Sequence, residues 1–315
     1  MGDIVGAGLL SHAPVIMFPE QRRIEANGGR DFTLATGLAR LRREVFDTVD
    51  HDTVVVLDSH WSTTTEAVVT SHSRRAGTYT SDEMPSELSR LPYDIPGDPA
   101  LARAVAATAG ERGLWVTAVD DPFLPLHYAT LNPWTYLGRS GRPWVSVSVC
   151  QTATTRDFLD IGAAIAGAVA ALDRRVLLVA SGGLSHAFWP LAELRERMAG
   201  DPAHIVTPQA READEQRIGW LEAGRHDLVI SGMPDFLRFA PEARFGHYLM
   251  LAGAVGGADC TAPGRRFSAY ENAIGTGQTH LWFDRPATGW TGAPAAPGTA
   301  GAAGGGGRHG DPVRR

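Results

Sequence analysis

The sequence predicts an α/β fold: a single domain with a central mixed sheet flanked by helices, and an active site at the carboxyl ends of the strands. Two observations predict this class. Short continuous apolar runs, typical of strands buried on both faces, alternate along the chain with segments of helical periodicity. Ligands of open α/β sheets bind beyond the carboxyl ends of strands, and the chemically active residues of this chain fall at such places.

The expected strands are short β-branched or apolar runs. They cover Ile4–Leu10, Thr53–Asp58, Trp144–Cys150, Val176–Ala180 and Leu228–Ser231. Helices are expected where apolar residues recur every three or four positions, within 34–45, 158–172, 212–220 and 245–254. Segments 73–98 and 118–135 are richer in Pro, Ser and Asp, so we expect long loops that shape a pocket.

The chain divides into a catalytic domain, residues 1–285, and a tail, residues 286–315. The tail consists mainly of Gly, Ala and Pro. We expect it to be disordered, because it has little apolar surface to bury against the entropy of ordering. No repeat or linker divides residues 1–285.

Composition excludes several classes of function. A net charge of -6 argues against nucleic acid or an anionic membrane as a partner. No apolar run approaches the roughly 20 residues of a membrane span, and the N-terminus does not resemble a signal peptide. Two cysteines, Cys150 and Cys260, form no disulfide framework. We expect a cytoplasmic protein.

Three histidines each follow an apolar strand. His12 follows Ile4–Leu10, His60 follows Thr53–Asp58, and His186 follows Val176–Ala180 by a few residues. Strand ends in one sheet can bring such residues together, although any one of them could equally be an ordinary loop histidine.

Neutral imidazole binds Fe, Zn and Cu, and two histidines with one carboxylate are typical of O2-activating Fe(II) sites. Glu242 is the best candidate for the carboxylate. It lies where a turn enters a helix and could point into a crevice. The simpler reading is a glutamate favoured by the helix dipole.

Four blocks together resemble the class III extradiol dioxygenase superfamily, the protocatechuate 4,5-dioxygenase type. They are Ser11-His12-Ala13-Pro14, Asp58-Ser59-His60-Trp61, Ser181-Gly182-Gly183-Leu184-Ser185-His186 and Gly275-Thr276-Gly277. Their order and spacing agree with the family from about residue 3 to 284. The resemblance implies that His12, His60 and Glu242 are iron ligands and that His186 is the acid/base histidine.

The segment Leu126-His127-Tyr128-Ala129-Thr130 looks closest to homoprotocatechuate 2,3-dioxygenases and 2-aminophenol 1,6-dioxygenases. When Thr130 is aligned, Tyr128 takes the place where many relatives have an active-site histidine. His127 stands where an acidic residue is usual. The alternative registration, with His127 facing the site, stays open, so both residues are candidates for catalysis.

The activity implied is Fe(II)-dependent cleavage of a catechol-type ring by O2, with Mn(II) as an alternative metal. Both oxygen atoms would enter a 3,4-dihydroxyphenylacetate-like substrate, giving a semialdehyde. His186 would move the substrate proton, since imidazole titrates near neutral pH. Tyr128 would hydrogen-bond a substrate oxygen. The expected partners are the aromatic diol, O2 and further copies of this chain in a homo-oligomer.

Alternatives remain: a 2-aminophenol-cleaving enzyme, a non-catalytic metal-binding relative, or a zinc hydrolase. His247 could contact Glu242 but is expected on a helix surface. His280 has no supporting context, and Trp61, Phe188 and Trp189 could line the pocket. Candidate anchors for a substrate carboxylate are Arg74, Arg75, Arg244, Arg265 and Arg266.

Overall fold

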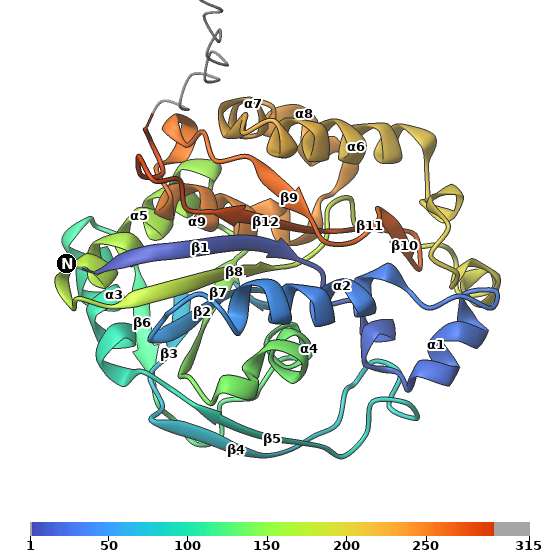
Figure 1. Ribbon diagram of the computed structural model, residues 1–315, viewed down its shortest axis with the longest axis horizontal. Coiled ribbons are helices and arrows are strands. Elements are labelled where there is room, and N and C mark those ends of the chain that lie inside the picture. The colour runs from blue at the N-terminus through green and yellow to red at the C-terminus, as the bar shows by residue number, and fades with distance from the viewer. Residues whose placement is uncertain (1, 293–315) are drawn as a thin grey trace, which may run out of the picture.

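Eight strands form the central sheet, in the order β6-β3-β7-β2-β8-β1-β12-β9 (Figure 1). The structure is a computed structural model and describes residues 2–292. The four central strands are mutually parallel: β7 (Trp144–Cys150), β2 (Thr53–Thr63), β8 (Arg175–Ser181) and β1 (Asp3–Leu10).

Antiparallel neighbours complete this sheet on both sides. Strands β12 (His280–Asp284) and β9 (Gly264–Arg266) extend it beyond β1, while β3 (Ala67–Thr70) runs antiparallel to β7 and pairs with β6 (Val116–Val119). The sheet is therefore mixed, which confirms the predicted fold class.

Successive side chains of the central strands alternate between two apolar cores. In β2, Val55 and Leu57 pack into one core, and Val54 and Val56 pack into the other. Helices α3 (Pro99–Glu111), α5 (Thr155–Ala171) and α9 (Gly246–Ala254) cover the first core, and α2 (Thr33–Leu41) and α4 (Tyr128–Leu137) cover the second. Burial on both faces explains why these strands read as continuous apolar runs.

The remaining elements lie at the periphery. Helices α6 (Pro208–Glu222), α7 (His226–Ser231) and α8 (Met233–Phe236) form a row beyond β9 (Figure 1). Helix α1 (Glu20–Ala26) lies beyond one end of α2. Two small hairpins pair β4 (Arg74–Tyr79) with β5 (Leu91–Pro96) and β10 (Glu271–Ala273) with β11 (Thr276–Gln278). Within the described residues, no helix is long and apolar enough to cross a membrane.

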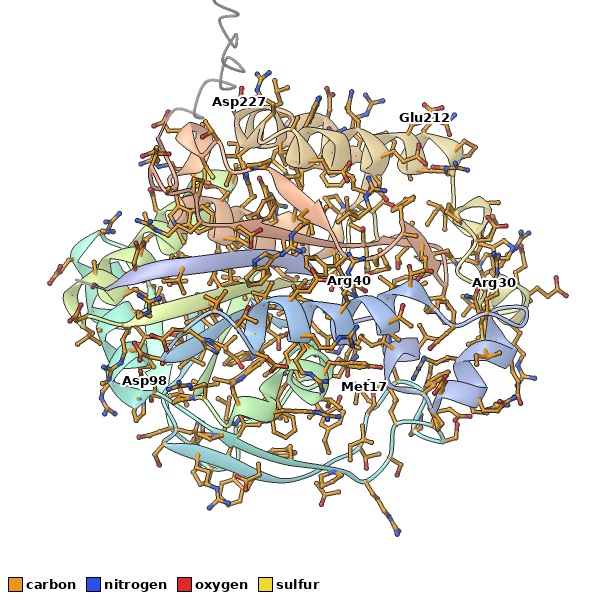
Figure 2. The ribbon with its side chains drawn as sticks, in the orientation of Figure 1. Met17, Arg30, Arg40, Asp98, Glu212 and Asp227 are labelled. Carbon is orange, nitrogen blue, oxygen red and sulfur yellow. The ribbon has the colours of Figure 1, made fainter. Side chains whose placement is uncertain are left out.

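Side-chain caps fix where several helices begin. Asp98, labelled in Figure 2, accepts a hydrogen bond from Leu101 N at the start of α3. Its other oxygen accepts from Thr53 and Arg174, so this one carboxylate joins α3 to β2 and to the start of β8. Helix α5 begins with a capping box between Thr154 and Asp157.

Three sequence predictions were wrong in their element type or extent. Leu228–Ser231, expected as a strand, lies in helix α7, because three apolar residues in a row are too few to distinguish the two periodicities. Segment 73–98 contains the β4–β5 hairpin, and segment 118–135 contains the first eight residues of α4. Strand β2 continues past Asp58 to Thr63, so His60 lies within the strand.

Residues just beyond the predicted boundary at 285/286 contact the catalytic domain. Trp290 is buried, and its indole Nε1 donates a hydrogen bond to the carbonyl of Ile4, 2.9 Å away. Thr261 binds the same segment through its hydroxyl, which donates to Gly292 O. The packed unit therefore extends to at least residue 292. The rest of the predicted tail lies outside the described residues.

We expect Trp290→Ala to lower the free energy of unfolding by about 3 kcal/mol, because it removes a buried aromatic side chain. The matched control is Trp115→Ala, since Trp115 is 64% exposed and should contribute less than about 0.5 kcal/mol. Urea denaturation of both variants measures the difference. Equal stability of the two variants would show that residues 286–292 do not belong to the folded unit.

Candidate active site

Three adjacent strand ends place the predicted histidines around one cavity. Strands β1, β8 and β2 are parallel neighbours, so the residues that follow β1 and β8 lie beside the carboxyl-terminal part of β2. His12, His60 and His186 all line a cavity of about 230 Å³, together with Glu242. A second pocket of about 510 Å³ adjoins it and shares His60, His186 and Glu242.

An irregularity in β2 turns Ser59 and His60 toward this cavity. The pairing of β2 with β7 shifts between Asp58 and Ser62, which leaves the residues between them outside the regular ladder. Asp58 stabilises the irregularity, because one carboxylate oxygen accepts from Trp61 N and the other from the hydroxyl of Thr130 on α4. Each residue of the Asp58-Ser59-His60 motif thus has its own structural task.

Glu242 is buried and held by three donors. Its Oε1 accepts a hydrogen bond from the Ser59 hydroxyl at 2.5 Å and lies 3.2 Å from Nε2 of His12. Its Oε2 accepts from Gly183 N at 2.5 Å. The backbone of Glu242 is anchored as well, since its N–H donates to Leu184 O. A carboxylate with this many donors can stay ionised inside the protein.

The chain leaves Glu242 in an unusual conformation. Ala243, Arg244 and Phe245 all have positive φ, at 45°, 58° and 61°. Non-glycine residues seldom adopt this region, and a run of three carries a cost of order 1–3 kcal/mol per residue. These three residues turn the chain directly from Glu242 into α9, which begins at Gly246. The sequence predicted that Glu242 lies where a turn enters a helix.

The charges of His12 and Glu242 support each other. Burial alone would raise the pKa of Glu242, but the adjacent His12 holds it well below its ordinary value. Burial alone would lower the pKa of His12, but Glu242 raises it. The pKa of His60 is lowered, first by burial and then by the positive charge of His12. The site therefore combines an anionic carboxylate with a neutral imidazole, both suited to a metal ion.

A proline in α4 helps to orient His12. Pro133 has no N–H to donate to Ala129 O, and the hydroxyl of Ser181 donates to that carbonyl instead, at 2.6 Å. The same hydroxyl oxygen lies 3.2 Å from Nδ1 of His12 and can accept a hydrogen bond from the Nδ1–H group. This arrangement directs the opposite nitrogen, Nε2, to Glu242 and the cavity.

Tyr128, not His127, lines the cavity. The Tyr128 ring lies 4.0 Å from the His60 ring, centroid to centroid, and its hydroxyl donates to Glu83 at 3.3 Å. Burial, together with the charge of Glu83, raises the pKa of Tyr128, so the phenol keeps its proton at neutral pH. His127 lies behind His60, with ring centroids 6.0 Å apart, and stacks on Trp61.

His186 is more accessible than His12 and Glu242. Its side chain is 31% exposed, its Nε2 lies 3.9 Å from Glu242 Oε2, and its ring packs edge-on against Phe188. Asp214 holds the preceding residue, because its carboxylate accepts from both the N–H and the hydroxyl of Ser185. Burial raises the pKa of Asp214 to about 6.

Two histidines lie where the sequence did not predict them. His247, expected on a helix surface, is completely buried, and a side chain at Gly182 would collide with its Nε2. His280 is also completely buried, and it connects two segments: Nδ1 accepts from Ser11 N, and Nε2 donates to Leu34 O. His280 therefore fixes the loop that carries His12. The one sequence feature that could have indicated this role is the position of His280 at the start of an apolar run, which forms strand β12 beside β1.

The candidate carboxylate anchors are scattered. Arg74, Arg265 and Arg266 form ion pairs on the surface, and Arg75 donates to Leu124 O. Arg244 lines the 510 Å³ pocket beside Glu242. None of the five is among the residues lining the 230 Å³ cavity.

The donor set fits a divalent transition metal, although the donors are not gathered around a point. Among residues 2–292, no group of three His, Cys, Asp or Glu side chains stands close enough together to hold a metal ion. The rings of His12 and His60 are 6.2 Å apart, centroid to centroid. The two imidazoles and the ionised Glu242 nevertheless face the same cavity and are the donor types that Fe(II) oxygenases use.

Comparison with known proteins identifies the class. A family model described as the catalytic LigB subunit of aromatic ring-opening dioxygenase matches residues 6–277, so the chain belongs to this family. It is 28% identical to a 3,4-dihydroxyphenylacetate 2,3-dioxygenase of Escherichia coli over 210 residues, covering 65% of this chain and 74% of the relative.

Two further similarities concern a second enzyme and a solved structure. The chain is 32% identical over 156 residues to a 2,3-dihydroxyphenylpropionate/2,3-dihydroxicinnamic acid 1,2-dioxygenase of Mycolicibacterium smegmatis, covering 44% of this chain and 46% of the relative. The crystal structure of an uncharacterized protein from Escherichia coli K12 shares the fold, with a TM-score of 0.59 and 15% identity, covering 89% of this chain and 99% of that one.

We expect His280 to make stability depend on pH. Burial lowers its pKa from 6.5 to about 4, so between these values the unfolded chain binds a proton that the folded chain does not. Its contribution is complete above pH 6.5 and declines as the pH falls, by about 2 kcal/mol between pH 7 and 5.

The variant His280→Gln should be less stable than the wild type at pH 7. It should also lack the pH-dependent contribution of His280 to the free energy of unfolding. Guanidinium denaturation at both pH values tests the expectation. The gap in stability between wild type and variant should narrow by that amount at pH 5. An unchanged gap would mean that the folded protein takes up the proton at His280 as readily as the unfolded chain does.

Proposed function

We propose that this protein is a non-haem Fe(II)-dependent extradiol dioxygenase that cleaves a catechol-type ring, with 3,4-dihydroxyphenylacetate-like compounds as the first candidate substrates. The observation that carries the proposal is the shared cavity: His12, His60, Glu242 and His186 line one space although they are far apart in the sequence. The named activities of the relatives support a dihydroxylated aromatic substrate.

In this proposal His12, His60 and Glu242 hold the metal, with Mn(II) as an alternative to Fe(II). Bound Fe(II) would supply open coordination positions for both substrate oxygens and for O2. The protein prepares the donors. Ser59 and Gly183 keep Glu242 ionised, and the low pKa of His60 keeps its imidazole neutral.

The cavity has the size and walls for one aromatic ring. An internal cavity of about 150 Å³ can bind benzene, and this one measures about 230 Å³. Pro14, Phe188 and Ile274 provide apolar walls, and the four proposed metal-site and acid/base side chains provide polar ones. A planar diol could therefore place its two oxygens toward Glu242 and its ring against apolar surface.

Two residues are placed to handle protons and substrate oxygens. His186 borders both pockets and is partly exposed, so it can take a proton from a ring hydroxyl and return it later. Tyr128 remains a neutral phenol and can donate a hydrogen bond to a substrate oxygen in place of Glu83. The His127 ring lies edge-on to the His60 ring, with centroids 6.0 Å apart, and we assign it the positioning of His60.

The direct test is oxygen consumption by the purified protein loaded anaerobically with Fe(II). We expect catechol and 3,4-dihydroxyphenylacetate to consume one O2 per ring and to give a coloured semialdehyde. Faster turnover of 2-aminophenol would identify the aminophenol-type enzyme. Metal binding without consumption of any of the three compounds would identify a non-catalytic relative.

Substitutions separate the acid/base from the ligands. We expect His186→Phe to keep its bound iron but to lose turnover by about 10²–10⁴-fold, the usual contribution of general acid–base catalysis. His12→Ala should lose the iron itself. Elemental analysis after desalting measures the metal without any substrate.

The matched control is His72→Ala, because the His72 imidazole contacts Asp121 O and lies outside the cavity. It should keep both iron and activity. If His186→Phe loses the iron and His12→Ala retains it, the roles assigned to these two histidines are reversed.

A further inference from the structure

The ring cavity adjoins a second, apolar pocket of about 400 Å³. Four residues line both spaces, so the two are contiguous: Pro14, Glu83, Ala273 and Ile274. The other walls of the second pocket are mostly apolar side chains, contributed by Val15, Met84, Leu194 and Met198, with the exposed Arg195 at the rim. The ring cavity therefore has an apolar pocket beside it, and the four shared residues form the boundary between the two spaces.

Ile274 lies at the junction in a conformation that its own chemistry disfavours. It is the first residue of the two-residue loop of the β10–β11 hairpin, where Ala273 pairs with Thr276. Ile274 has a φ of 51° and Gly275 a φ of 111°. Hairpin loops with two positive φ values favour Asn, Asp or Gly at the first position, and a β-branched residue there is a strong outlier.

A second residue that lines the apolar pocket, Met84, also has a positive φ. Met84 has a φ of 53°, and its side chain faces the pocket together with that of Ile274. Strained residues of this kind persist where the surroundings hold them, and they gather at ligand sites. Both exceptions put a large apolar residue at a positive φ, and both residues line this pocket.

We propose that the apolar pocket binds an uncharged hydrocarbon substituent of several carbons on the aromatic substrate, and that Ile274 and Met84 determine this specificity. The inference rests on the proposed ring-cleaving function and refines its substrate class. The preferred substrate is an alkyl-substituted catechol. The short carboxylate side chain of 3,4-dihydroxyphenylacetate fits this pocket poorly.

The charges around the junction support an uncharged substituent. Glu83 lines both cavities, so its carboxylate faces any group that passes from one to the other. Arg244, a possible partner for a carboxylate, lines the 510 Å³ pocket and is not among the residues lining the apolar pocket. Each methylene that is buried strengthens binding by about fourfold, so a four-carbon chain should have a large effect.

The experiment compares catechol, 4-butylcatechol and 3,4-dihydroxyphenylacetate with the Fe(II)-loaded enzyme. We expect kcat/KM for 4-butylcatechol to exceed that for catechol by at least about tenfold. We expect 3,4-dihydroxyphenylacetate to gain no comparable advantage. Preference for the carboxylate substrate over 4-butylcatechol would overturn the proposal and direct attention to Arg244.

A matched pair of leucine variants tests the pocket itself. Leu194→Asn places an amide in the pocket wall and should lower the ratio of kcat/KM for 4-butylcatechol to that for catechol by about tenfold. Leu191→Asn changes a leucine that is 86% exposed and lies outside the pocket, so both values should stay as in the wild type. Equal ratios in the two variants would overturn the proposal.

The variant Ile274→Asn separates function from local stability. Asn suits this turn, so the melting temperature should be unchanged or higher, while the preference for 4-butylcatechol should fall. A lower melting temperature with an unchanged preference would show that Ile274 serves packing alone.

Calorimetric binding distinguishes failure of this inference from failure of the proposed function. If no catechol is cleaved, the ring-cleaving function is wrong. Tighter binding of 4-butylcatechol than of catechol to the wild type, and not to Leu194→Asn, would still support the pocket. Cleavage of catechols with equal affinity for both compounds would refute the pocket alone.

Discussion

A carboxylate that is removed from water must be compensated by hydrogen bonds or by opposite charge, or it will take up a proton. Glu242 is such a group, and its three partners come from three different parts of the chain. Ser59 comes from the irregular end of β2, Gly183 from the loop after β8, and His12 from the loop after β1. The carboxylate can remain ionised only where these segments meet. The sheet order β2-β8-β1 makes them neighbours.

The surrounding structure fixes each partner in turn. Asp58 binds both Trp61 N and Thr130, and so determines the shape of β2 where Ser59 and His60 face the cavity. Ser181 links the carbonyl released by Pro133 to the ring of His12. Asp58, Thr130 and Ser181 do not line the 230 Å³ cavity, yet their hydrogen bonds determine how His12 and His60 face it. The same reasoning explains why Gly182 carries no side chain, since one would displace Ser59.

The sequence predicted the central sheet well because strands buried on both faces are continuous apolar runs with clear ends. It also placed His12, His60, His186 and Glu242 near one another, through strand ends and through the resemblance to a family. It could not predict that β2 continues beyond Asp58, because the residues there are polar and serve the cavity. It could not predict the burial of His247 or His280 either, because a single buried histidine leaves no periodic pattern in the sequence.

Other misses have equally physical causes. Leu228–Ser231 contains only three apolar residues, and a helix of six residues produces the same run. Trp290 lies in a segment of small residues and Pro, and a single aromatic side chain decides whether such a segment packs. The apolar pocket beside the ring cavity arises from residues 14–15, 83–84, 194–198 and 273–274, which only the folded chain brings together.

The central claim is that burial of an ionised Glu242 creates a metal site with His12 and His60 while His186 stays free. A crystal structure of the Fe(II)-loaded protein with an anaerobically bound catechol tests it most directly. We expect iron within roughly 2–2.5 Å of His12 Nε2, the His60 imidazole and a Glu242 oxygen, with His186 hydrogen-bonded to the ring hydroxyl. Iron bound through His186, or a Glu242 that remains turned away from the metal, would contradict it.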